Sequence, residues 1–119
     1  MRIKLFGLAM LLLAVSTPAK PPKVTIRIAG ACEPAVLADL IRQTKNVSDA
    51  TVFWVCREQL WNTLAQKQGF SPSVPAVSNW KRGEIFLKAV TFENDISMLK
   101  AALTHEFEHL RCRCSQGEH

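Results

Sequence analysis

Apolar and polar residues alternate in parts of this 119-residue chain. Residues 24–28 and residues 84–89 show the alternation, and residues 51–55 form a continuous β-branched and aromatic run. A period of two is typical of a strand with one buried face, whereas an uninterrupted apolar run is typical of a strand buried on both faces. The pattern therefore predicts three strands.

Between these segments the apolar positions recur every three to four residues, which is the period of a helix. Three helices are predicted, over residues 34–44, residues 57–69 and residues 95–111. Asn94 or Asp95 is suited to cap the third helix, because a short polar side chain can accept a hydrogen bond from the first turn.

The predicted elements follow one another as strand, helix, strand, helix, strand, helix. Residues 70–80 carry two prolines and three serines, and we expect them to form a loop. The fold class that fits best is a small α+β domain over residues 20–119, with a three-stranded sheet packed with three helices. The alternation allows parallel pairing of the strands but does not decide it.

The first nineteen residues are predicted to be a secretory signal peptide. Arg2 and Lys4 make a basic start, residues 5–15 are apolar and uncharged, and Thr17 and Ala19 are small residues at a suitable cleavage site. The apolar run is shorter than the ~20 residues of a membrane span, which favours cleavage over an uncleaved anchor. We expect an exported protein, periplasmic or secreted, with no stable membrane anchor after cleavage.

The charge pattern does not point to a particular partner. Without Arg2 and Lys4 the chain has 13 basic and 10 acidic side chains, and the basic ones are scattered. Nucleic-acid-binding domains usually concentrate their basic residues in a patch or stripe. No nucleic-acid partner is therefore expected.

Four cysteines remain after the predicted cleavage: Cys32, Cys56, Cys112 and Cys114. An even number in a small exported domain predicts two disulfide bonds, and four cysteines allow three pairings. A direct bond between Cys112 and Cys114 is the least favourable of these, because its ring would be small and strained. We expect each of these two cysteines to pair with one of the earlier two.

The third predicted helix carries the motif HExxH, which is His105-Glu106-Phe107-Glu108-His109. Side chains at i and i+4 lie one above the other on a helix, so both imidazoles can direct a nitrogen at one ion. The glutamate beside the first histidine can then take a proton from a water that the metal activates. The motif arises by chance in about 0.3% of shuffled sequences of this composition, and it predicts a zinc site.

On a helical wheel, His105 and His109 lie nearly opposite the predicted core face of this helix. Their side of the helix is semi-apolar, which suggests the wall of a cleft. The core face consists of five apolar residues, Ile96, Leu99, Leu103, Phe107 and Leu110.

The segment 104–110, preceded by the predicted strand 83–89, resembles the core of zincin-type metallopeptidases. The resemblance implies that His105 and His109 are zinc ligands and that Glu106 is the catalytic general base. It also implies that residues 83–89 form an edge strand that aligns an extended peptide or protein substrate. A chain this small would leave a shallow cleft, which a partner chain could complete.

The third metal ligand is left open by the sequence. The position six residues after His109, where one branch of the zincins has a histidine, is Ser115. His119 is the first candidate because it is the remaining histidine, and Gly117 could turn the chain back towards the helix. Glu118 and Cys112 are the alternatives.

The predicted function is therefore that of an exported zinc-dependent hydrolase, a minimal metallopeptidase. One alternative is a non-catalytic metal site closed by His105, His109, Cys112 and Cys114, which would need reduced thiols. Another is a disulfide-stapled binding or inhibitor module without a metal.

Overall fold

The computed structural model describes residues 20–114, so the predicted signal peptide and the predicted ligand His119 lie outside the described residues. The described part is a mixed α+β domain, as predicted. It has four strands and four helices, so the expected three of each was wrong in number. In chain order these are β1 (Val24–Ala29), α2 (Leu37–Gln43), β2 (Ala50–Val55), α3 (Glu58–Gln68), β3 (Ala76–Asn79), β4 (Glu84–Lys88), α4 (Ala89–Phe92) and α5 (Ile96–Cys112).

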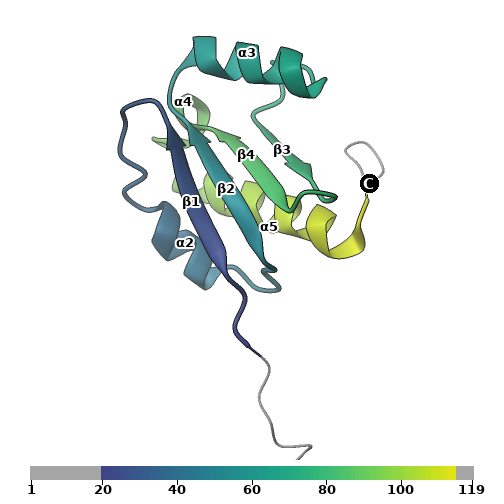
Figure 1. Ribbon diagram of the computed structural model, residues 1–119. Helices are drawn as coiled ribbons and strands as arrows, with labels where there is room; N and C mark the ends of the chain where they lie inside the picture. Colours follow the sequence, from purple (N-terminus) through teal and green to yellow (C-terminus); the bar gives the residue numbers. More distant parts are fainter. Residues whose placement is uncertain (1–19, 115–119) are drawn as a thin grey trace, which may run out of the picture.

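The strands form one sheet in the order β1-β2-β4-β3 (Figure 1). β1 pairs with β2 and β2 pairs with β4 in parallel, whereas β3 pairs antiparallel to β4. β3 was not predicted, because its four residues lie within the serine- and proline-rich segment 70–80 that reads as a loop. This unpredicted strand forms one edge of the described sheet.

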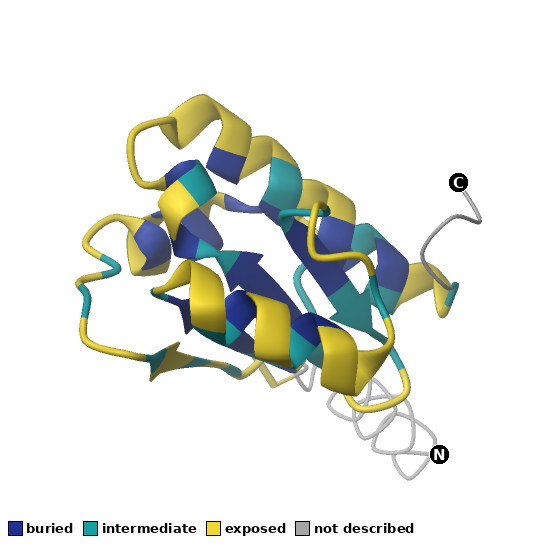
Figure 2. Ribbon diagram, turned by 90° about the horizontal axis from the view of Figure 1, so that it is seen from above, coloured by how far each residue is buried: buried dark blue, intermediate teal, exposed yellow. Residues whose placement is uncertain are grey.

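Helices cover both faces of the sheet. Helix α3 packs on one face through Trp61, against Val77 and Phe86. The other face is covered by α2, α4 and α5, which contribute most of the larger core cluster. Figure 2 shows the result: the buried residues lie on the strands and on the helix sides turned towards them, and the exposed residues lie on the outer sides.

Helix α5 begins where the sequence predicted. The Asp95 carboxylate accepts a hydrogen bond from the Met98 backbone N–H at 2.9 Å, which caps the first turn. Leu99, Leu103 and Phe107 are buried in the core, as predicted. Ile96 is 53% exposed, so its assignment to the core was wrong. The first turn of α5 therefore extends beyond the core.

The predicted disulfide pairing was wrong. Cys32 pairs with Cys56, and Cys112 pairs with Cys114. The short pair becomes compatible with the backbone because Arg113, between the two cysteines, adopts the left-handed conformation (φ 56°) at the end of α5. This turn reverses the chain, so that Cys114 lies back against the helix that carries Cys112.

Two disulfides in a domain of this size are typical of proteins from oxidising compartments. None of the helices within residues 20–114 is both long enough and apolar enough to span a membrane.

Candidate metal centre

Helix α5 carries the whole HExxH motif, and its two histidines differ in exposure. His105 is exposed, whereas His109 is fully buried at 0%. The expectation that both imidazoles form an open cleft wall was therefore wrong for His109. Glu106 and His109 widen the buried face of α5 beyond Leu99 and Leu103, because α5 also packs against β3.

The two imidazoles approach each other through the same ring nitrogen. Nε2 of His109 lies 3.1 Å from Nε2 of His105, and the ring planes are nearly perpendicular, at 84°. Two nitrogens that bind one zinc ion at about 2.0–2.1 Å with a tetrahedral angle lie about 3.3 Å apart. The contact is itself a hydrogen bond between the two rings, and its length is close to the separation of two ligands that share one ion.

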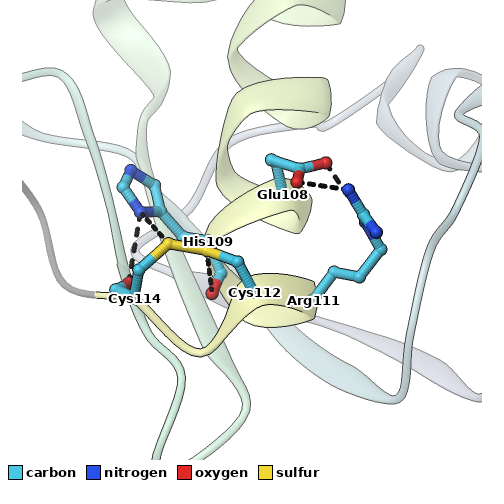
Figure 3. A network of polar contacts seen from close by, with 5 residues as sticks. All are labelled: Glu108, His109, Arg111, Cys112 and Cys114. Carbon is cyan, nitrogen blue, oxygen red and sulfur yellow. Dashed lines mark hydrogen bonds and ion pairs between the residues drawn. A yellow bond between two sulfur atoms is a disulfide. The ribbon is translucent and has the colours of Figure 1, made fainter. Parts of the chain in front are cut away.

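The other nitrogen of His109 lies against the backbone. Nδ1 of His109 is 3.2 Å from the carbonyl oxygen of Cys114, at a distance that allows its N–H to donate (Figure 3). An imidazole that donates from Nδ1 keeps its lone pair on Nε2, and metal-binding histidines are commonly oriented in this way. The left-handed turn at Arg113 and the Cys112–Cys114 disulfide place this carbonyl.

Glu106 is buried at 2% exposure, close to the two histidines in sequence. Its Oε1 atom has no hydrogen-bond partner among the described residues. Burial raises the pKa of the Glu106 carboxyl from 4.5 to about 7, and the nearby Ser78 hydroxyl opposes part of this shift. A buried carboxyl with an unsatisfied oxygen is costly for a fold, so its presence here suggests a functional requirement.

Ser78 comes from β3 and was not identified from the sequence. Ala76, two residues earlier, packs in the core on the α5 side of the sheet, and alternation places Ser78 on that side too. The sequence signal was weak, because a serine in a serine- and proline-rich segment usually indicates a loop. The pairing of β3 with β4 is what brings this hydroxyl to Glu106.

The edge strand beside the motif helix is β3, which corrects the expectation for residues 83–89. The strand in that segment, β4, lies between β2 and β3, so both of its edges are paired. On the side of β3 that faces α3, a cavity of about 300 Å³ is lined by Phe70, Val77 and Trp80, among others. This cavity and Glu106 therefore lie on opposite sides of the edge strand.

Of the three candidates for the third metal ligand, only Cys112 lies within the described residues. His119 and Glu118 lie outside the described residues, so their roles stay predictions. Cys112 is bonded to Cys114, and a disulfide sulfur is not the thiolate that binds zinc. No cysteine is free among the described residues, so the four-ligand site of the non-catalytic alternative is not available in the oxidised protein.

One group of three potential metal donors is found within residues 20–114, and it consists of His109, Cys112 and Cys114. This group could hold a metal ion, but only if the disulfide is reduced. In this group His109 would contribute Nδ1, the ring nitrogen that lies beside Cys114 at the end of α5 (Figure 3). The other ring nitrogen, Nε2, is the one that faces His105.

The chain matches no protein-family model, no curated protein and no solved structure.

The raised pKa of Glu106 predicts how the stability of the metal-free protein depends on pH. The folded state holds the Glu106 proton up to about pH 7, whereas the unfolded chain loses it near 4.5. The free energy of unfolding should therefore fall by about 3 kcal/mol as the pH rises from 4.5 to 7. Urea unfolding at pH 5 and pH 8, in the presence of a chelator, measures this fall.

Glu106→Gln should remove most of this pH dependence and stabilise the metal-free protein at pH 8. Glu108→Gln is the matched control, because Glu108 lies on the same helix but pairs with Arg111 at the surface. The control should keep the wild-type pH dependence. An unchanged slope in Glu106→Gln would show that the Glu106 carboxyl titrates normally.

Proposed function

We propose that this protein is an exported zinc-dependent hydrolase of the zincin type, and that it cleaves peptide bonds. The observation that carries the proposal is the convergence of the two Nε2 atoms at 3.1 Å, on the same helix as a buried glutamate. Three further features support it: the Cys114 carbonyl that orients His109, the raised pKa of Glu106, and an edge strand beside the helix.

His105 and His109 would hold the zinc ion through Nε2, and His119 is the proposed third ligand. A zinc ion in such a site supplies Lewis acidity and lowers the pKa of a coordinated water towards about 7. The Cys114 carbonyl can keep the Nδ1 proton of His109 in place, so that the lone pair on Nε2 would be available to such an ion.

Glu106 is the proposed general base. A general base works best when its pKa lies near the operating pH, and burial brings the pKa of Glu106 to about 7. Its Oε1 atom, which lacks a partner among the described residues, can accept a proton from water and pass it to the leaving amine. The Ser78 hydroxyl acts as a positioning group for this carboxyl, because its hydrogen bond stabilises the charged carboxylate.

The substrate is proposed to be an extended peptide that lies along β3. Peptides commonly bind by adding a strand to an exposed sheet edge, where backbone hydrogen bonds give affinity and side-chain pockets give specificity. The cavity lined by Phe70, Val77 and Trp80 runs beside this strand, and Lys81 contributes a positive charge to it. Alternate side chains of a bound peptide would point towards this cavity and towards the histidines.

The proposal is tested by incubating the zinc-loaded, oxidised protein with casein, an unfolded protein, and analysing the fragments by mass spectrometry. Cleavage is expected, and it should stop on addition of 1,10-phenanthroline and return when zinc is restored. A tightly folded protein of similar size should be cut much more slowly, because it offers no extended segment to β3. Cleavage that resists the chelator would contradict a metal-dependent mechanism. Zinc binding without any cleavage would favour a non-catalytic metal site.

A further inference from the structure

A second group of metal-binding atoms lies at the C-terminal end of α5. The donor atoms of His109, Cys112 and Cys114 all lie within 4.8 Å of one another. Figure 3 shows the imidazole of His109 directed at the disulfide, with Sγ of Cys114 at 3.9 Å from Nδ1. In the oxidised protein the two sulfurs are bonded to each other, so this group is available only after reduction.

We propose that reduction of the Cys112–Cys114 disulfide creates a second metal site, which binds a thiophilic ion such as zinc. Its ligands are the thiolates of Cys112 and Cys114 together with Nδ1 of His109. This site goes beyond the proposed hydrolase centre, because it needs neither His105 nor Nε2 of His109.

The donor set and its spacing suit such an ion. Two cysteines and one histidine form a known zinc ligand set, and soft thiolates favour zinc and copper(I) over magnesium and calcium. A nitrogen and a sulfur bound to the same zinc ion lie about 3.6 Å apart, as calculated from the usual bond lengths and a tetrahedral angle. The 3.9 Å between Nδ1 of His109 and Sγ of Cys114 requires only a small adjustment.

The two disulfides differ in ways that make the Cys112–Cys114 bond the accessible one. Cys112 is exposed and Cys114 is half-buried, at the end of a helix. Cys32 and Cys56 are 24 positions apart and pack against the main core. A disulfide that closes a long loop restricts the unfolded chain far more than one that links residues two positions apart. Exposed disulfides with little structural role are commonly the labile ones.

The chemical step is a thiol–disulfide exchange with a dithiol. The dithiol supplies two electrons and two protons, the Cys112–Cys114 bond breaks to give two thiols, and the dithiol becomes a disulfide. Binding of the ion then releases the thiol protons.

The two metal sites exclude each other at His109. A neutral imidazole has one lone pair, on either Nδ1 or Nε2. In the oxidised protein the Cys114 carbonyl accepts from Nδ1, which leaves Nε2 for the ion shared with His105. Coordination through Nδ1 would move the proton to Nε2 and remove His109 from the first site. The oxidation state of Cys112 and Cys114 therefore selects which site is formed.

The test uses the full mature chain, stripped of metal and reduced with a phosphine under argon, with zinc and cobalt(II) as probes. The His105→Ala variant isolates the second site. On reduction, its affinity for zinc should rise at least about 100-fold. Its cobalt(II) form should gain the near-ultraviolet charge-transfer band of thiolate ligands. His105→Ala combined with Cys112→Ser and Cys114→Ser is the matched control, since it keeps Cys32 and Cys56, and it should gain neither.

The proposal is overturned if reduced His105→Ala gains no metal, or if the gain survives in the control, which would assign it to Cys32 and Cys56. The hydrolase centre is judged separately, in the oxidised wild-type protein. Failure of one site therefore leaves the result for the other unaffected.

Discussion

Replacing Glu106 by glutamine is expected to lower the rate of peptide hydrolysis by about 10²–10⁴-fold while the zinc content stays the same. Glutamine has nearly the same shape as glutamate but cannot accept a proton at neutral pH. The proposed zinc ligands, His105 and His109, are left in place. The measurement is kcat on a cleaved peptide, with the zinc content of each preparation determined in parallel.

Glu108→Gln provides the control for this prediction. Glu108 is on the same helix, two residues further on, and it forms an ion pair with Arg111 at the surface. Surface ion pairs contribute about 0–1 kcal/mol to stability, so this change should leave both folding and hydrolysis nearly unchanged. If Glu106→Gln hydrolyses peptides as fast as the wild type, Glu106 is not the general base.

The same Glu106→Gln variant should gain stability above pH 7 in the metal-free state. Burial of the Glu106 carboxyl raises its pKa to about 7. Above that pH the folded protein contains a buried charged carboxylate, which lowers its free energy of unfolding. A fold that keeps such a group against its own stability is typical of a functional site. Loss of activity combined with a gain in stability would distinguish a catalytic residue from a structural one.

The sequence was enough to predict the pair of histidines, because their convergence depends only on the helical spacing of four residues. Their environment could not be predicted in the same way. Two contacts surround the end of α5 that carries His109. β3 packs against the helix from a distant part of the sequence, and the chain turns back after the helix so that Cys114 lies against His109. The predicted core face of α5 was therefore too narrow, since the buried face extends through Glu106 to His109.

Among the strands, too, those with a clear local pattern were predicted, whereas the one that depends on tertiary pairing was not. β1, β2 and β4 were predicted from their apolar patterns, whereas β3 was not, because Ala76–Asn79 is short and follows two prolines. β3 is held by its pairing with β4 and by the packing of Val77 and Ala76 on opposite faces. The Ser78 hydroxyl reaches Glu106 only through this pairing.

The disulfide prediction failed because ring strain was judged from sequence separation alone. The backbone at Arg113 turns into the left-handed region, which brings the chain back on itself and makes the short pair attainable. A non-glycine residue in that conformation is not predictable from its type. The same turn supplies the Cys114 carbonyl that orients His109, so the unpredicted disulfide belongs to the proposed centre.

If His105 and His109 together hold a zinc ion, as proposed, the oxidised protein should contain zinc. Elemental mass spectrometry should be applied to the wild type, to His105→Ala and to Thr104→Ala, an exposed neighbour on the same helix. His119→Ala belongs in the same series, and it should bind zinc more weakly if His119 is the third ligand.

About one zinc per chain is expected in the wild type and in Thr104→Ala, with the zinc lost in His105→Ala. A wild-type protein that takes up no zinc even after incubation with the metal, or a His105→Ala variant that keeps it, would contradict a zinc site at these two histidines.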